Sequence, residues 1–517
     1  MTTASDVPPP PTGNDSAGWL ERTAARLEFN RAVAYALLLR GWQLAAGVVS
    51  AVLIALYFTP DVQGYYYTFS SLLTLQALFE LGCGQVLANL CSHEWAALRL
   101  DDRGRVSGDA AALSRLAHLS RLMFKLYGTL LAVFVVTVGF GGAAFLALQP
   151  ANGVEWRGPW FALVAASGLL LWTMPFNAML EGCNQVAAVN RFRLIQAVCA
   201  NVTVWIALVL HADLWVAVFA TVVRVAVELS LLLVRYRRFF ASLLMQSRVE
   251  SRESRAGERN APPTTHQPDV GGRRPDVGGL TSGDQPSDSQ LSTLNSQLST
   301  THHSTFSWKR EIWPLQWRLG LQAPFGFLAS SLYVPVLWYY QSKAVAGQMG
   351  MTWMMLFAVQ AAALAWVQAR IPQFGVLVAR KEYGELDRLF RRLTVISVAA
   401  VTLGGLALCA IVVLLNELGV GLAERILPPM ETAAFAAAFA VLQWSHCLAV
   451  YLRAHKRDPL WTANLLYYSA SGVAAWYFAS RFGPLAAGLG YLGTILIVNS
   501  PLQTAIWVVC RREWHRQ

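Results

Sequence analysis

Apolar stretches near the length of a bilayer crossing recur along the whole sequence, and they constrain the fold more than any other feature. About 20 apolar residues span the hydrocarbon core as a helix. The runs are too long and too evenly apolar for barrel strands. We predict an all-α, polytopic membrane protein with twelve spans, at Ala32–Phe58, Tyr65–Leu90, Leu122–Leu148, Trp160–Leu180, Leu194–Leu210, Leu214–Val234, Trp313–Tyr340, Gly347–Val367, Leu393–Leu415, Ala433–Leu452, Leu460–Ala479 and Leu485–Val509.

The composition argues against several soluble domains, although 517 residues would suffice for them. Hydrophobic residues make up 55% of the chain and charged residues only 14%, where soluble domains carry about 25%. The amino terminus shows no cleavable signal pattern. The seven cysteines have no paired spacing, so we expect neither a disulfide framework nor a metal site. We expect no cofactor.

The basic residues predict an orientation. With twelve spans, 34 of the 41 Lys and Arg residues fall on the side of the termini. The opposite side holds only Arg157, Lys343, Arg425 and Arg481. By the positive-inside rule, we expect both termini in the cytoplasm and the protein in the inner membrane. The net charge of +11 then needs no nucleic-acid partner.

The chain divides into two halves. Residues 247–305 are rich in Ser, Thr, Gly, Pro, Gln and Asp and contain short direct repeats, a composition that cannot bury a core. We predict a polar tail at 1–31, a six-helix N-lobe at 32–240, a disordered linker at 241–311, a six-helix C-lobe at 312–510 and a tail at 511–517.

The two halves resemble each other in the same direction. Each has a short turn ending in glycine, Val62-Gln63-Gly64 and Val345-Ala346-Gly347, before a helix with a mid-span glutamine, Gln76 or Gln360. Basic connections follow at Ser92–Arg121 and Pro372–Arg392. Six spans per half imply a parallel repeat about an axis along the membrane normal.

Polar and charged side chains inside the spans are the candidate functional residues, because burying them in a bilayer is costly. Several share one helical face. The candidates for a central cavity are Arg40, Gln43, Gln76, Glu80, Arg224, Glu228, Arg318, Gln322 and Gln360. Arginines turned inward would make this cavity cationic, which suits an anionic cargo and phosphate in particular.

A structural interpretation of the same residues stays open. Arg224 and Glu228 are one turn apart and can neutralise each other as a packing pair. Arg40 can bridge to Glu80 on the next helix, and Arg318 lies close enough to its helix end to snorkel to the surface.

The segment from Gly64 to Leu73, followed by Leu78-Phe79-Glu80-Leu81-Gly82-Cys83-Gly84, resembles polysaccharide-export flippases of the Wzx/PST type. These belong to the multidrug/oligosaccharidyl-lipid/polysaccharide (MOP) exporter superfamily. Polar turns at Leu180–Asn184 and Leu452–Lys456 also resemble that family. The amino tail and the linker depart from it.

The resemblance implies a MATE-like, V-shaped bundle that flips lipid-diphosphate-linked oligosaccharide by alternating access and is not an enzyme. By this resemblance the three arginines would hold diphosphate or acidic sugars. Glu80 and Glu228 would orient the cargo or couple transport to a proton or sodium gradient. Membrane lipids and polysaccharide-assembly proteins are the expected partners. The alternatives are a cation or drug antiporter of the same superfamily and a polytopic glycosyltransferase or polymerase of surface polysaccharide.

Overall fold

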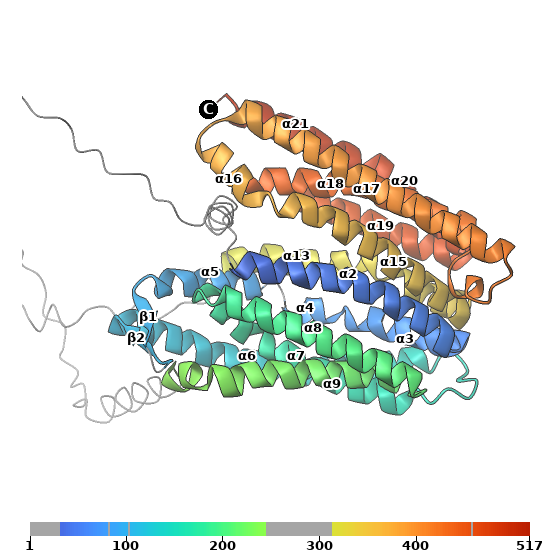
Figure 1. The fold of residues 1–517 in the computed structure, drawn as a ribbon, viewed down its shortest axis with the longest axis horizontal. Helices are drawn as coiled ribbons and strands as arrows, with labels where there is room; N and C mark the ends of the chain where they lie inside the picture. Colours follow the sequence, from blue (N-terminus) through green and yellow to red (C-terminus); the bar gives the residue numbers. More distant parts are fainter. Residues whose placement is uncertain are drawn as a thin grey trace, which may run out of the picture.

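The computed structural model describes residues 31–80, 83–101, 104–243, 313–455, 457 and 459–516. The predicted amino tail and the predicted linker lie almost entirely outside these residues. The described chain forms an elongated bundle of helices in two lobes (Figure 1).

Helices occupy all twelve predicted apolar stretches. The N-lobe contains α2 (Arg31–Tyr57), α3 (Pro60–Leu73), α4 (Gln76–Glu80), α5 (Cys83–Trp95), β1 (Leu98–Leu100), β2 (Val106–Gly108), α6 (Ala110–Leu146), α7 (Arg157–Gly182), α8 (Val186–Val209), α9 (Trp215–Ser230) and the π-helix η1 (Leu231–Arg235). The C-lobe contains α13 (Trp313–Ser330), α14 (Tyr333–Tyr340), α15 (Lys343–Gln368), α16 (Ile371–Ala379), α17 (Tyr383–Glu417), η2 (Ala423–Arg425), α18 (Pro429–Ala454), α19 (Trp461–Phe482), α20 (Pro484–Thr494), the π-helix η3 (Ile495–Asn499) and α21 (Ser500–Trp514).

The protein is a multi-pass membrane protein. Within the described residues, nine helical runs are long and apolar enough to cross a membrane, and α13 with α14 makes a tenth if this pair, bent by 48°, counts as one span. The other two predicted spans are not continuous, strongly apolar helices, each for a physical reason. The second is broken into α3, α4 and α5, and α19 carries polar residues such as Asn464 and Ser471 that are buried inside the bundle.

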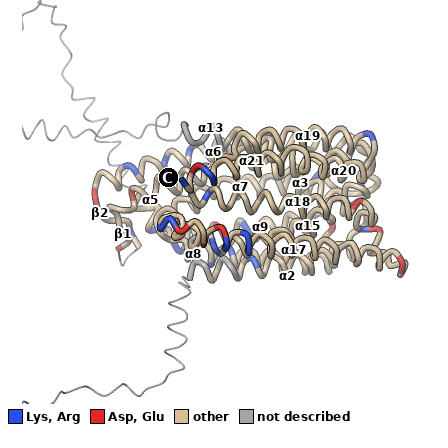
Figure 2. Tube along the Cα trace, turned by 90° about the horizontal axis from the view of Figure 1, so that it is seen from above, with Lys and Arg blue, Asp and Glu red and all other residues tan. Residues whose placement is uncertain are grey.

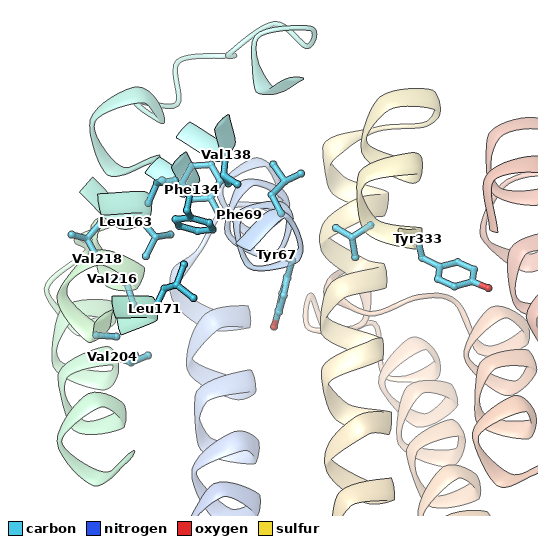
Figure 3. Close-up of a cluster of buried hydrophobic side chains, with 14 of the residues drawn as sticks. Tyr67, Phe69, Phe134, Val138, Leu163, Leu171, Val204, Val216, Val218 and Tyr333 are labelled. Carbon is cyan, nitrogen blue, oxygen red and sulfur yellow. The ribbon is translucent and has the colours of Figure 1, made fainter. Parts of the chain in front are cut away.

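The packing confirms the parallel repeat. In the N-lobe α2 packs on α8, α8 on α9, α6 on α7, and α7 on α9. The C-lobe repeats these pairs in the same chain order, with α13 on α19, α19 on α20, α17 on α18, and α18 on α20. The last span of each lobe also contains a π-helical turn, η1 or η3. Large aromatic side chains fill both interiors, with Phe69 and Phe134 in the N-lobe and Tyr333 inserted among the C-lobe helices (Figure 3).

Two local predictions were wrong. The glycine-containing segments at 62–64 and 345–347 are not turns but the first turns of α3 and α15. The reason is capping: the hydroxyls of Thr59 and Ser342 each accept a hydrogen bond from a backbone N–H three residues on, as N-cap residues do.

The predicted basic connections also contain more structure than expected. Residues 92–121 hold an antiparallel hairpin that pairs Leu98 with Gly108. They also hold the first turns of α6, where the side chain of Asp109 caps the helix by accepting from Ala112 N at 2.8 Å. The second connection forms α16 and the start of α17.

The lobes meet where α15 packs against α2 and α3, and α13 packs against α4. Glycines allow α3 and α15 to approach closely. A Cβ atom on Gly64 would lie 2.3 Å from the carbonyl oxygen of Lys343, and one on Gly350 would lie 2.3 Å from Cβ of Tyr67. Gln63 strengthens this contact by donating from Nε2 to the carbonyl oxygens of Gly347, at 3.1 Å, and Arg425, at 2.9 Å.

The two ends of the bundle differ in charge and in spacing. Lys and Arg gather at the end where the C terminus lies, which we call the basic end, and are sparse at the opposite end (Figure 2). From the α3–α15 contact toward the basic end, α15, α16 and α17 diverge from the N-lobe helices, while α13 stays beside α4 and α5 (Figure 1).

At the basic end a polar cluster fixes α21 to α17 and α18. Arg511 donates from Nε and Nη2 to Oδ2 of Asp387, at 3.0 and 2.5 Å, and the Tyr451 hydroxyl donates to Oδ1 at 2.9 Å. His515 stacks on Tyr383 with ring centroids 4.2 Å apart. Burial lowers the pKa of His515, so the imidazole is neutral at pH 7. Helix α21 continues to Trp514, whereas the sequence analysis placed the start of a terminal tail at residue 511.

The α3–α15 contact predicts the effect of added volume. Gly64→Ala should lower the free energy of unfolding by about 1–3 kcal/mol, because the new methyl group meets backbone that cannot rotate away. Gly141→Ala in α6 is the matched control, since its Cβ meets nothing within 4 Å. Thermal unfolding in detergent measures both. Equal midpoints for the two variants would contradict the close contact.

Candidate functional site

Two cavities adjoin the short helix α4. The N-lobe cavity, about 760 Å³, is lined by Gln76 and Glu80 of α4 and by residues of α2, α5, α7, α8 and α9. The C-lobe cavity, about 610 Å³, is lined by Thr74 and Ala77 on the other side of the same segment and by C-lobe helices. The break in the second span therefore places one five-residue helix between the two cavities.

The break after α3 and the break between α13 and α14 meet beside these cavities. The hydroxyl of Ser71, near the end of α3, donates at 2.5 Å to the carbonyl oxygen of Ser331, which lies between α13 and α14. A carbonyl freed by a helix break needs such a partner, because no lipid group can satisfy it. The contact joins the interrupted spans of the two lobes beside the cavities.

Five of the nine predicted residues line the N-lobe cavity. They are Gln43 on α2, Gln76 and Glu80 on α4, and Arg224 and Glu228 on α9. The pairs on α4 and α9 are each four residues apart, so both members lie on one helical face.

Glu228 is held by amides from two other helices. Asn177 of α7 donates from Nδ2 to Oε1 of Glu228. Gln196 of α8 donates from Nε2 to Oε2 at 3.1 Å and also to the carbonyl oxygen of Arg224 at 3.0 Å. Among the described side chains Arg224 and Glu228 form no ion pair, so the packing-pair interpretation does not describe this structure. Arg224 is exposed to the cavity instead.

The N-lobe cavity carries charges of both signs. Arg193 pairs with Glu181 at 2.5 Å on its wall. Beyond that pair, the described lining holds the guanidinium of Arg224 and the carboxylates of Glu80 and Glu228. The sequence analysis expected a cationic cavity that also contains Glu80 and Glu228, and the described lining contains more carboxylates than arginines.

Of the remaining predicted residues, Arg40 and Gln322 lie outside the two linings, and the place of the Arg318 side chain is not described. Arg40 is exposed on α2 and outside the lining, although its neighbours Leu39 and Gln43 are in it. It forms no ion pair with Glu80 among the described side chains. Arg318 lies on α13, but its side chain is outside the described residues. Gln322 lies on α13, partly buried and outside both linings.

Gln360 lines the C-lobe cavity and is buried. A chain of amides continues across its wall. Gln503 donates from Nε2 to Oδ1 of Asn464, at 3.0 Å, and of Asn499, at 2.7 Å. Asn499 in turn donates to the hydroxyl of Ser445 at 3.0 Å. The π-helical turn η3 ends at Asn499 and sets its position in this chain.

Aromatic side chains make up much of the remaining C-lobe wall. Trp353, Phe439, Tyr467, Tyr468 and Tyr491 all line the cavity. The lining includes Arg453 and His446 but no Asp or Glu among the described residues. The two cavities thus differ in chemistry. Both contain amides, but the described lining of the first adds carboxylates and arginines, whereas that of the second adds aromatic rings and Arg453 without a carboxylate.

Sequence reasoning missed several residues of the N-lobe cavity. Asn177, Arg193 and Gln196 line it but were not among the nine predicted cavity residues. A usable signal was present for α8, because Arg193, Gln196 and Ala197 are three and four residues apart and share one face. No local signal predicts that this face meets Glu228.

Solved structures share the architecture. An inward-facing multidrug resistance MATE family transporter of the MOP superfamily superposes with a TM-score of 0.56, at 10% identity, over 91% of this chain and 96% of its own. An outward-facing MATE transporter gives 0.52 at 12% identity, over 94% and 96%. The lipid II flippase MurJ, inward closed, gives 0.51 at 10% identity, over 92% and 87%. The chain has the MATE-like fold of MOP-superfamily transporters.

At the level of sequence, no protein-family model and no curated protein matches the chain. The MATE-like fold explains the two-lobed repeat and the cavities on either side of α4. It is shared by structures described as multidrug transporters and by one described as a lipid II flippase, so the cargo has to be argued from the chemistry of this chain.

The amide cradle of Glu228 predicts a coupling between residues. Asn177→Ala should lower the free energy of unfolding by about 1–3 kcal/mol, because a buried carboxylate loses a donor. In a Glu228→Gln background, Asn177→Ala should lower the free energy of unfolding by clearly less. A double-mutant cycle in thermal unfolding measures the difference, and equal costs in both backgrounds would contradict the contact.

Proposed function

We propose that the chain is a membrane transporter of the MOP superfamily that flips lipid-diphosphate-linked oligosaccharide across the inner membrane by alternating access. The C-lobe cavity carries this proposal. Sugars present hydroxyl groups and apolar C–H faces, which amides and aromatic rings match. Gln360, Asn464 and Gln503 beside Tyr467 and Tyr491 supply both kinds of group.

The N-lobe cavity would take the diphosphate. Arg224 is exposed there and has no carboxylate partner among the described residues, so its planar guanidinium is available for bidentate hydrogen bonds to phosphate. Because α4 separates the two cavities by a single helix, one cargo can place its phosphates and its sugars on either side of it.

A carrier is needed for such a cargo on physical grounds. Each unpaired hydroxyl costs about 4–8 kcal/mol in an alkane-like core. A polar cavity replaces the lost water contacts, while the lipid tail remains in the bilayer beside the lobes. We propose transport rather than glycosyl transfer because the structures that share the fold are described as transporters and a flippase.

The concentration of Lys and Arg at the basic end (Figure 2) supports a cytoplasmic location for that end and for both termini. The lobes diverge toward it, so we infer an inward-open arrangement. Cargo would enter from the cytoplasmic leaflet.

A second candidate is the antiport of an organic cation or drug. It is favoured by the carboxylates of Glu80 and Glu228 on the N-lobe cavity, because a carboxylate can pair with a cationic cargo. In the flippase proposal, the same carboxylates would couple transport to protons or sodium.

The test is a reconstituted flipping assay with fluorescent lipid-linked oligosaccharide, run with and without a proton or sodium gradient. Arg224→Ala should slow flipping at least about tenfold, since one charged hydrogen-bonding partner contributes roughly 1.5–3 kcal/mol. Arg40→Ala, on the exposed face of α2, is the matched control and should retain most activity. Transport of an organic cation without flipping of the lipid-linked sugar would overturn the proposal in favour of the second candidate.

Gln503→Leu tests the sugar cavity separately. It removes the donor to both Asn464 and Asn499 while keeping a similar volume. We expect flipping of a multi-sugar substrate to fall several-fold, with flipping of the lipid diphosphate alone unchanged. Equal losses for both substrates would contradict the assignment of the C-lobe cavity to sugar.

A further inference from the structure

A third hollow lies at the basic end of the N-lobe, apart from the two cavities. Its volume is about 850 Å³. The β1–β2 hairpin contributes Leu100, Asp101 and Gly104 to one wall, and η1 with the residues after it forms the other. We call it the hairpin pocket.

The fold turns aromatic side chains inward and arginines outward along residues 235–239. Tyr236 is buried, and its hydroxyl donates to Oε1 of Gln185 at 2.9 Å. Phe239 is fully buried, with its ring centroid 6.3 Å from that of Trp95. Arg235 precedes these two buried residues, and Arg237 and Arg238 lie between them. The three arginine side chains are exposed and line the pocket.

The hairpin is fixed against the same segment. The backbone N–H of Val106 donates to the hydroxyl of Ser242 at 3.4 Å. Leu98 and Val106 are buried under the hairpin. The wall that faces the arginines is therefore part of the folded N-lobe.

The described lining of the pocket carries a net positive charge. Its described lining holds three guanidinium groups and one carboxylate, that of Asp101. That carboxylate is already engaged, because its Oδ1 accepts a hydrogen bond from the backbone N–H of Arg105 at 2.6 Å. Among the described lining residues, three arginines therefore accompany one carboxylate.

Directly beside the arginines the lining becomes apolar and exposed. Leu233 and Val234 also line the pocket, and they are 65% and 74% exposed. They belong to the final turn of a candidate membrane span that ends at Arg235. A row of arginines at the end of a span, next to lipid-facing aliphatic side chains, matches a phosphate headgroup above its acyl chains.

We propose that the hairpin pocket binds the headgroup of an anionic phospholipid from the leaflet at the basic end. Arg235, Arg237 and Arg238 hold the phosphate, and Leu233 and Val234 contact the acyl chains. The site is separate from the cargo cavities. Phe192 lines the hairpin pocket and Arg193 lines the N-lobe cavity, so α8 stands between the two.

Bound lipid would stabilise η1, which begins three residues after Glu228. The lipid site therefore lies about one helical turn from Glu228, a polar residue of the N-lobe cavity.

The experiment measures thermal unfolding of the full chain in phosphatidylcholine nanodiscs with increasing phosphatidylglycerol. Wild type should gain stability as the anionic lipid increases. The triple variant Arg235→Gln, Arg237→Gln, Arg238→Gln should lose most of that gain, with half-saturation shifted at least about tenfold. The matched control is Arg388→Gln, Arg391→Gln, Arg392→Gln on α17, which removes the same charge from exposed positions of the C-lobe and should respond like wild type.

Three results would overturn the proposal. Phosphatidylglycerol could leave wild type unchanged. The two triple variants could lose the response equally, which would indicate general surface attraction. Inorganic phosphate or pyrophosphate could reproduce the stabilisation in neutral nanodiscs, which would assign the pocket to a free anion. If the glutamine variant does not fold, the Arg→Lys triple variant replaces it, and we expect it to keep a weakened response. No sugar or flipping is involved, so failure here leaves the flippase proposal to its own test.

Discussion

The close packing of α3 on α15 is the contact on which the rest of the structure depends. Gly64, Gly347 and Gly350 remove the side chains that would hold the two backbones apart. Between helices in lipid, where no hydrophobic force draws them together, such small-residue contacts supply much of the attraction. The lobes meet through this contact, they diverge from it toward the basic end, and α4 with its two cavities lies beside it.

The polar interior of the bundle is tolerable because each costly group has a partner. The freed carbonyl of Ser331 accepts from Ser71, and the carboxylate of Glu228 accepts from two amides. Unpartnered groups of this kind would cost several kcal/mol in a low-dielectric interior. Because the partners of each buried polar group come from different helices, these hydrogen bonds form only when the helices are packed together.

The fold was largely predictable from the sequence because the span length and the hydropathy pattern leave few alternatives. The faces of single helices were also predictable: Arg224 with Glu228, and Gln76 with Glu80, line one cavity as their four-residue spacing indicated. Contacts between helices were not. Asn177 and Gln196 reach Glu228 from helices whose rotation about their own axes no local pattern specifies. Arg40 is exposed and lies outside the lining, although Gln43 on the same helix is part of it. The capped starts of α3 and α15 were missed because the glycine-containing segments at 62–64 and 345–347 were taken as turns.

The central claim is that two lobes joined at α3–α15 open at the basic end and exchange access to both cavities. Double electron–electron resonance between spin labels at Asn89 of α5 and Gln373 of α16 tests it most directly, in a background in which the seven native cysteines are replaced. Both positions are exposed, and the helices that carry them, α5 and α16, lie near the basic end in different lobes (Figure 1). The distance should shorten when lipid-linked oligosaccharide and the driving gradient are supplied. A distance distribution that stays unchanged while the protein flips its cargo would contradict the account.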